Sequence, residues 1–206
     1  MGILPTSGFT IDATNGIFVD GSLDLRVVPD DANPLYTGTD VSFVFQFSQV
    51  AGSGVRTVFR ADNQADDAYS EVRIDGSGNL IWDVNGTATT GIAITDLNAS
   101  NRVACTYDTA GNIAVSVNGA TSVTNTGATV PANVHTIWLG NDNGSDQLTG
   151  YIQDRIFAIG LEMTAAQLEA ASDVNTTFIC GTFPADMIAA GDFSADDFDS
   201  DDFDTG

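Results

Sequence analysis

The stretch Val41–Ser48 reads Val-Ser-Phe-Val-Phe-Gln-Phe-Ser, and its phenylalanines stand two residues apart. Successive side chains of a β-strand point to opposite faces of the sheet, so Phe43, Phe45 and Phe47 would share one face. The opposite face begins and ends with polar side chains. The pattern therefore predicts a half-buried strand that turns one face toward a hydrophobic core.

The same alternation recurs along the chain, and Asn-Gly or Asp-Gly turn signals separate the repeats. About ten strands are expected, enough for two packed antiparallel sheets. The expected strands are Ile17–Val19, Leu23–Val27, Val41–Ser48, Val55–Arg60, Ser70–Asp75, Asn79–Val84, Arg102–Tyr107, Ile113–Val117, His135–Leu139 and Tyr151–Ile159. A short helix is expected at Thr164–Ala171, because Thr164 and Gln167 form a capping box, and Thr176–Thr182 would add a final strand.

Composition limits the class of protein and its partners. The chain has 206 residues, 43% of them hydrophobic, which suits one domain with a sizeable core. It carries 28 acidic residues against 6 basic ones, all arginine, for a net charge of −22. A charge of this sign repels phosphate backbones and anionic lipids, so nucleic acid and anionic membranes are excluded as partners. We see neither a membrane-spanning run nor a secretion signal, and expect synthesis in the cytoplasm without membrane insertion.

The two cysteines are too few for a disulfide framework or a cysteine zinc site. We expect Cys105 and Cys180 to be buried free thiols, with a single disulfide as the alternative.

Composition changes near the C-terminus. From Asp186 onward the chain holds eight acidic residues and no basic one, with Asp-Asp-Phe-Asp at 196–199 and again at 201–204. We therefore divide the chain into a domain at 1–185 and an acidic tail at 186–206. The tail is either a solvated, disordered segment or a docking peptide that anchors in a partner through Phe193, Phe198 and Phe203, which are spaced by five residues.

Three stretches together resemble the laminin-G-like, concanavalin A-like jelly-roll domains. The first stretch, residues 102–119, resembles two successive strands of the family, the first ending in Tyr107-Asp108 and the second in Asn118-Gly119. The second stretch, residues 136–142, resembles a family strand that ends in glycine. The most specific stretch is 148–168, where Gly150-Tyr151-Ile152 opens a strand that leads into a helix beginning at Thr164. In place of the family's Trp-His-His before Arg102, this chain has Asn98–Asn101, so the resemblance points to no single subfamily.

The resemblance implies an all-β fold, a two-sheet antiparallel jelly-roll sandwich with one short helix near its C-terminal end and the acidic tail outside it. Domains of this kind usually bind glycans or proteins and do not catalyse reactions. Segments similar to Arg155–Leu168 occur in bacteriophage tail and capsid-surface proteins, which implies a virion protein. Virion surface proteins of this type are commonly homo-oligomers, although no coiled-coil heptads are present here.

A glycan site needs an exposed aromatic ring to stack on sugars and nearby hydrogen-bonding side chains. Trp82 and Trp138 lie within expected strands, so we expect them to pack in the core. Tyr69 lies in a polar stretch and is the better candidate for exposure. Asn141 and Asp142 would supply hydrogen bonds beside it.

Two oxygen-rich loops are candidate Ca²⁺ sites, since Ca²⁺ accepts several oxygen ligands in flexible geometry. Solvated turns are the alternative, because an acidic chain produces such clusters by chance. The candidate ligands are Asp62, Asn63, Asp66 and Asp67 in the first loop and Asp142 and Asp146 in the second.

Signals for catalysis are weak. Glycoside hydrolysis needs a carboxylate pair, and Glu71 with Asp75 is the best available, on a face shared with Arg73. A cross-strand ion pair of Arg73 with its acidic neighbours is the simpler interpretation. His135 has no nucleophile motif near it, so we expect it to be structural.

The leading hypothesis is a non-catalytic virion structural protein, a capsid decoration or tail-fibre component, whose jelly roll binds a host cell-surface glycan. Its partners would be other virion proteins. The alternatives are a polysaccharide-degrading lyase or glycoside hydrolase on the same fold, and a purely structural jelly roll attached through its acidic tail.

Overall fold

The computed structural model describes residues 10–12, 16–20, 25–27, 34–63, 67–142 and 146–175. Contacts within the chain divide it into two units, Met1–Val174 and Asn175–Gly206. The fold described below belongs to the first unit. The expected domain boundary at 185, the expected strand Thr176–Thr182, Cys180 and the tail residues Phe193, Phe198 and Phe203 lie outside the described residues.

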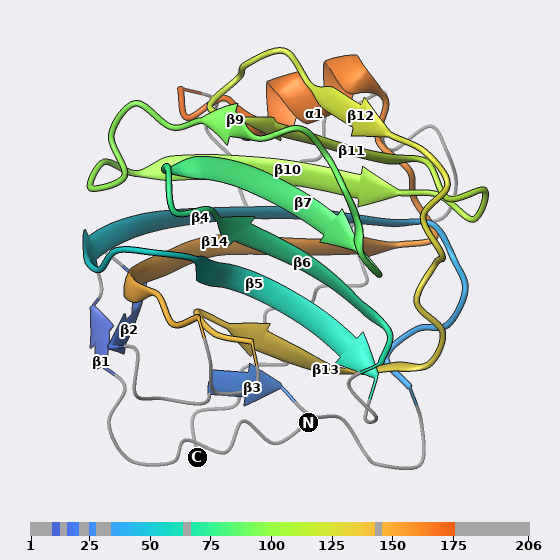
Figure 1. Cartoon of the computed structure of the whole chain (residues 1–206), viewed down its shortest axis with the longest axis horizontal. Helices are drawn as coiled ribbons and strands as arrows, with labels where there is room; N and C mark the ends of the chain where they lie inside the picture. The colour runs from blue at the N-terminus through green and yellow to red at the C-terminus, as the bar shows by residue number, and fades with distance from the viewer. Residues whose placement is uncertain are drawn as a thin grey trace, which may run out of the picture. The chain divides into compact units, whose positions relative to one another are not determined.

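The first unit is a sandwich of two antiparallel sheets (Figure 1). Sheet A contains, in spatial order, β1 (Thr10–Asp12), β2 (Gly16–Asp20), β14 (Thr149–Ile159), β4 (Val41–Ala51), β10 (Asn101–Tyr107), β11 (Ile113–Val117) and β12 (Val123–Asn125). Sheet B contains β3 (Leu25–Val27), β13 (Val134–Leu139), β5 (Arg56–Asn63), β6 (Tyr69–Ile74), β7 (Asn79–Val84) and β8 (Thr87–Ala88), with β9 (Ile92–Ala93) also paired to β7. The predicted all-β jelly-roll sandwich is therefore confirmed.

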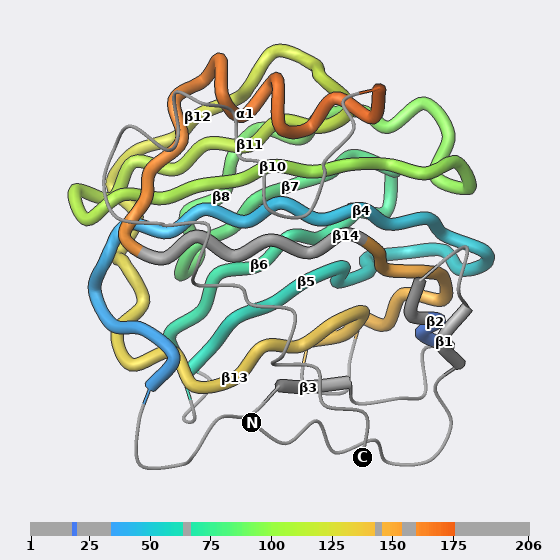
Figure 2. Tube along the Cα trace, turned by 180° about the vertical axis from the view of Figure 1, so that it is seen from behind, coloured from blue at the N-terminus to red at the C-terminus, as the bar shows by residue number. Residues whose placement is uncertain are grey.

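The helix α1 (Ala165–Ser172) lies across β10 and β11 on the outer side of sheet A, which faces the viewer in Figure 2. Its start follows the predicted capping box: the backbone N–H of Gln167 donates to the Thr164 hydroxyl, and the Gln167 side chain accepts from the Thr164 backbone N–H. Leu168 and Ala171 are the apolar residues that the helix buries. No helix among the described residues is long and apolar enough to cross a bilayer.

All ten predicted strands are present, with ends that shift by up to three residues. The prediction missed β1, β8, β9 and β12, which are two or three residues long and too short for alternation to show. Two Asn-Gly turns act as expected: Asn85 and Gly86 both have positive φ, as do Asn118 and Gly119. Positive φ at both central residues matches the right-handed twist of a hairpin.

Gly150 lies near the start of β14, where the backbone of β4 approaches closely. The register between β14 and β4 shifts between Thr149 and Gly150. A Cβ atom at Gly150 would lie 2.0 Å from the Ser48 carbonyl oxygen, so only glycine fits this close approach. The glycine at position 150, which contributes to the family resemblance, is therefore required by local packing.

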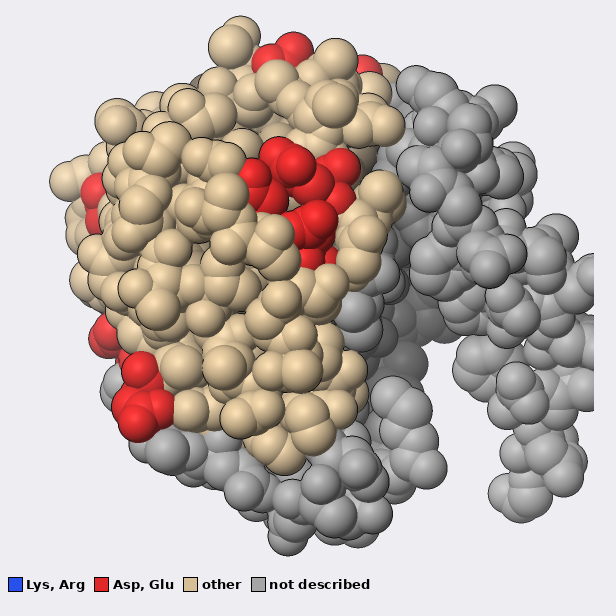
Figure 3. Space-filling view, turned by 90° about the vertical axis from the view of Figure 1, so that its right-hand side faces the viewer, with Lys and Arg blue, Asp and Glu red and all other residues tan. Residues whose placement is uncertain are grey.

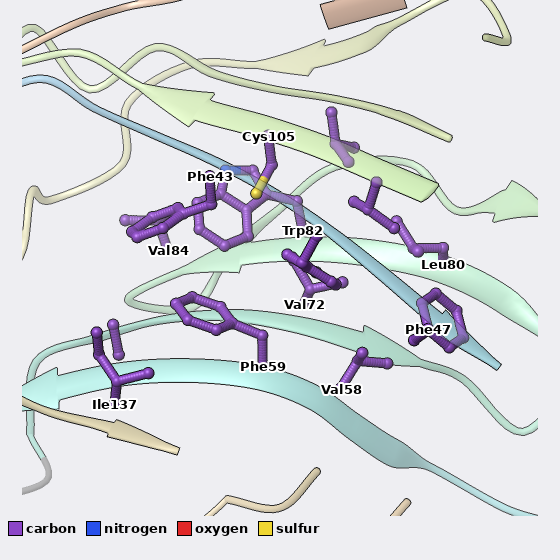
Figure 4. Close-up of a cluster of buried hydrophobic side chains, with 14 of the residues drawn as sticks. Phe43, Phe47, Val58, Phe59, Val72, Leu80, Trp82, Val84, Cys105 and Ile137 are labelled. Carbon is purple, nitrogen blue, oxygen red and sulfur yellow. The ribbon is translucent and has the colours of Figure 1, made fainter. Parts of the chain in front are cut away.

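The core lies between the sheets and is rich in aromatic side chains (Figure 4). Phe43, Phe45 and Phe47 all point inward from β4, as their spacing predicts. The Phe43 ring lies 4.8 Å from the Phe59 ring and 5.9 Å from that of Trp82, centroid to centroid. Trp82 is fully buried, and its indole N–H donates to the Thr106 carbonyl at 3.1 Å. These contacts join the two sheets.

Cys105 is a free thiol on the inner side of β10, fully buried, as predicted. Burial raises its pKa well above the ordinary value. The thiol therefore behaves as a small apolar group of the core.

Candidate functional site

The outer side of sheet B carries a group of charged and aromatic residues. Phe59, Val72 and Trp82 point into the core, so their neighbours along β5, β6 and β7 point outward. We call this surface the polar face, and its members are Thr57, Arg60, Asp62, Tyr69, Glu71, Arg73, Asp83 and Trp138.

Strand register brings four of these residues into one row across the sheet. Trp138 of β13 is paired with Arg60 of β5, Arg60 with Glu71 of β6, and Glu71 with Asp83 of β7. Directly opposite residues have Cβ atoms about 4.5–5.5 Å apart. Residues that are far apart in sequence therefore meet because of the order of strands in sheet B.

Ion pairs connect the row. The Arg60 Nε atom lies 3.2 Å from Asp62 Oδ2, and Arg60 Nη1 lies 3.7 Å from Glu71 Oε2. Arg73 faces the same Glu71 oxygen at 4.0 Å and Asp83 Oδ2 at 3.2 Å. The predicted cross-strand pairing of Arg73 with acidic neighbours is confirmed.

Neutral donors complete the network. The Trp138 indole N–H donates to Asp62 Oδ2 at 2.9 Å. The Thr57 hydroxyl donates to Glu71 Oε1. Both oxygens of Glu71 and one oxygen of Asp62 are therefore engaged by side chains of neighbouring strands.

The carboxylates of the polar face are buried, although they lie outside the core. Glu71 is 4% exposed and Asp83 is 3% exposed. Burial raises the pKa of Glu71 above its ordinary value, and nearby Asp142 raises it further, whereas the Thr57 hydrogen bond and the two arginines act against the shift. Replacing buried ion pairs by well-packed apolar residues is often neutral or stabilising, so this network is weak evidence for added stability of the fold.

Tyr69 is the aromatic group at one end of the polar face. It is partly buried, and the Arg60 guanidinium lies 4.2 Å from the centre of its ring. Such a cation over an aromatic face is favourable and fixes the plane of the ring. Burial raises the pKa of the Tyr69 hydroxyl, and the charges of Asp83 and Glu71 add to the effect. Its hydroxyl therefore remains a neutral hydrogen-bonding group at physiological pH.

The second predicted loop lies near the other end of the polar face. Asn141 is buried and Asp142 is partly buried, close enough to Glu71 to influence its pKa. The backbone N–H of Thr57 donates to the carbonyl of Asp146. Tyr69 and Asp142, both predicted to bind ligand, thus lie on either side of Glu71.

The first predicted calcium loop divides into separate groups. Asp62 turns to the polar face, where it binds Trp138 and Arg60. Asn63 turns to its own loop: its Nδ2 atom donates to Asp67 Oδ1 at 2.6 Å, and its Oδ1 atom accepts from the Asp67 N–H. Asp66 lies outside the described residues.

The first candidate calcium loop follows the C-terminal end of β5, and the second follows the C-terminal end of β13. Because β5 and β13 are antiparallel neighbours, these two ends lie at opposite edges of the sheet, and the loops do not form one site. Within the described ranges, no three His, Cys, Asp or Glu side chains are grouped so that they could hold a metal ion. Calcium at either loop stays a prediction.

The sequence interpretation missed Arg60, Asp83 and Trp138 as members of the site. The signal was present for Arg60 and Asp83, because each is a charged residue between two buried apolar ones in a strand. Trp138 was expected in the core; it is buried but lies on the polar face, outside the hydrophobic cluster that contains Trp82. Its alternation with Ile137 and Leu139 reveals the side it faces.

No protein-family model matches the sequence, and no curated protein matches it either. Solved structures do match. Domain 4 of an extracellular arabinanase from Geobacillus stearothermophilus, in complex with arabinotriose, has a TM-score of 0.59 and 17% identity over 82% of each chain. Domains LG4-5 of the mouse laminin alpha1 chain give a TM-score of 0.54 and 14% identity, over 68% of this chain and 40% of the laminin chain.

The sialidase module CBM40 of Ruminococcus gnavus, bound to alpha2,3 sialyllactose, gives a TM-score of 0.51 and 14% identity over 65% of this chain and 83% of that one. At such identities the likeness concerns the fold. The chain has the laminin-G-like, concanavalin A-like jelly-roll fold, as the sequence resemblance implies.

Proposed function

We propose that this chain is a non-catalytic glycan-binding module and that the polar face of sheet B is its binding surface. The observation that carries the proposal is the network of fixed carboxylates and guanidinium groups next to the Tyr69 ring. Sugars offer hydroxyl groups for hydrogen bonds and C–H faces for stacking, and the groups of this face that a sugar could reach are the partly exposed Tyr69 ring and the Arg73 guanidinium, whose side chain is 31% exposed.

The similar structures support this proposal by analogy of fold. The arabinanase domain is described with arabinotriose and the CBM40 module with sialyllactose. Fold alone does not define a ligand, so the argument rests on the polar face of this chain.

The state of the carboxylates favours binding over catalysis. The pair considered for an enzyme was Glu71 with Asp75. Asp75 holds the turn between β6 and β7, where its carboxylate accepts from the N–H groups of Ser77 and Asn79 at 2.8 and 2.9 Å. Glu71 is buried and has both oxygens engaged. Neither carboxylate is arranged to attack or protonate a glycosidic bond.

The proposed location is the surface of a virus particle, where the module would bind a host cell-surface glycan. The similarity of Arg155–Leu168 to segments of phage surface proteins supports this location, and the acidic composition suits a surface that keeps particles apart. Attachment to other virion proteins through Phe193, Phe198 and Phe203 belongs to the same proposal. Deletion of residues 192–206 would then remove the chain from particles, and full incorporation of the truncated chain would contradict the attachment.

The test of glycan binding is an array of oligosaccharides incubated with the purified full chain, once with Ca²⁺ and once with a chelator. Tyr69→Ala should weaken binding by about tenfold or more, as expected when an aromatic anchor is truncated. Tyr151→Ala is the matched control, because Tyr151 lies on sheet A and its ring contacts Phe18 at 5.0 Å. No binding in either condition would contradict the proposal, and loss of binding with chelator alone would assign a role to Ca²⁺.

A further inference from the structure

We infer that the polar face selects neutral glycans and rejects glycans that carry carboxylates. This inference rests on the proposed function, since it specifies the ligand class of the same surface. The reason is that each arginine described on this face is already neutralised by carboxylates of the chain itself.

Arg60 is enclosed by the network. Its side chain is 9% exposed, with Asp62 at 3.2 Å, Glu71 at 3.7 Å and the Tyr69 ring on one side. A ligand carboxylate reaching Arg60 would have to displace the buried carboxylates of Asp62 and Glu71. Displacing them would leave buried charge uncompensated, which is strongly unfavourable.

Arg73 is the more accessible cation, because its side chain is 31% exposed. It lies 3.2 Å from Asp83 and 4.0 Å from Glu71, so an incoming anion would meet two like charges at the same guanidinium. Asp83 is held in place by a second contact, since its Oδ1 atom accepts from the Gly86 N–H at 2.8 Å. The acidic partner of Arg73 is therefore fixed and does not move aside at low cost.

Among the side chains of the network that the structure describes, the acidic groups outnumber the basic ones. Asp62, Glu71 and Asp83 face Arg60 and Arg73, and Asp142 adds a further acidic group near Glu71. A neutral sugar carries no charge and meets no charge repulsion at this face. An acidic sugar meets like charge at short range.

The wider surface has the same sign. Burial raises the pKa of Glu162, and the nearby charges of Asp108 and Asp40, where β10 ends and β4 begins, raise it further. Figure 3 shows a patch of acidic atoms on this side of the molecule, with no basic atoms among the described residues on the visible face. With a net charge of −22, the chain repels acidic ligands at long range as well.

The experiment is an array that pairs neutral oligosaccharides, including arabinotriose and lactose, with acidic ones, including 3′-sialyllactose and oligogalacturonates, at low and high NaCl. Binding confined to neutral glycans and insensitive to NaCl is the expected result. An acidic glycan bound more tightly than its neutral counterpart would overturn this inference and leave the proposed function standing. An array with no bound glycan would overturn both.

A charge variant tests the cause. Asp83→Asn keeps an oxygen for the Gly86 N–H and removes the charge that faces Arg73. The freed guanidinium should then bind a ligand carboxylate, so affinity for acidic glycans should rise about tenfold relative to neutral ones. Asp96→Asn is the matched control, because Asp96 is exposed in a loop outside the polar face and its loss changes net charge equally.

Glu71→Gln is a second variant in case Asp83→Asn fails to fold, since it also removes a charge shared by both arginines. Equal behaviour of the polar-face variants and Asp96→Asn would overturn the inference, because net charge alone would then set the preference.

Discussion

The two sides of sheet B are built from the same strands and differ in what they bury. On the inner side, Phe59 and Trp82 pack against Phe43 in an apolar core. On the outer side, the neighbouring residues Arg60 and Asp83 belong to a network of buried charges. Burial of aromatic surface stabilises the fold directly, whereas buried charges contribute little net stability. The comparison indicates that apolar burial explains the inner side, whereas the outer side is the surface for which we propose a binding role.

The largest expected effect is on the inner side. Trp82→Ala should lower the free energy of unfolding by about 3–5 kcal/mol, because it removes a fully buried ring and leaves a cavity between the sheets. Trp138→Ala should cost less, because Trp138 lies outside the hydrophobic cluster. Urea unfolding of both variants measures the difference. If the two variants lost equal free energy of unfolding, the inner and outer sides of sheet B would not differ in their contribution to stability.

Loss of one network cation should have a smaller effect. Arg60→Met should lower the free energy of unfolding by about 2 kcal/mol, since Asp62 and Glu71 lose a charged partner but keep the Trp138 and Arg73 contacts. Arg56→Met is the control on the same strand, because Arg56 is also buried and donates to the Gly52 carbonyl at 3.0 Å. A loss no greater than that of the control would show that the ion pairs do not hold the face together.

The pH dependence of stability should carry the signature of Glu71. A raised pKa means that the folded chain binds the proton more tightly than the unfolded chain, so stability falls as pH rises from the ordinary glutamate value, about 4.3, through the raised one. Glu71→Gln removes this decline, and its stability relative to the parent should be higher at pH 7 than at pH 4.

Asp75→Asn provides the contrast for that experiment. Hydrogen bonds from Asn79 lower the pKa of Asp75, so its stabilisation is present above the ordinary aspartate value and is lost as pH falls through the lowered one. The relative stability of Asp75→Asn should therefore be lower at pH 7 than at pH 3. If the relative stabilities of both variants changed with pH in the same direction, the opposite pKa shifts of Glu71 and Asp75 would be contradicted.

The smallest expected signal comes from Cys105. In a Cys180→Ser variant, a thiol reagent should leave Cys105 unmodified in the native protein, because the thiol is fully buried and its pKa is raised. Denaturant should restore normal reactivity. Native-state labelling at the rate of a free cysteine would show that the inner side is open to solvent.

The sequence predicted the fold well because alternation and turn chemistry are local. The spacing of Phe43, Phe45 and Phe47 was enough to predict their strand and its buried face. The dipeptide Asn85-Gly86 was enough to predict a hairpin turn. The prediction of the helix start rested on a capping box of two residues. These signals do not depend on which strands become neighbours.

The site was predicted only in part because it depends on strand order. Glu71 and Arg73 were recognised as one face of a strand, but Asp83 and Arg60 join them through pairing of β6 with β7 and β5. Trp138 comes from β13, which is adjacent to β5 in the sheet and far from it in sequence. Nothing local in the sequence specifies that pairing.

The most decisive experiment follows the two tryptophan indole N–H signals in a ¹H–¹⁵N spectrum of the full chain during titration with the neutral glycan that binds best on the array, starting with arabinotriose. Trp138 donates to Asp62 on the polar face, and Trp82 donates to Thr106 in the core. If the glycan binds at the polar face, the Trp138 signal shifts with saturation while the Trp82 signal stays in place. Saturable binding that leaves the Trp138 signal unmoved would rule out the polar face as the binding surface.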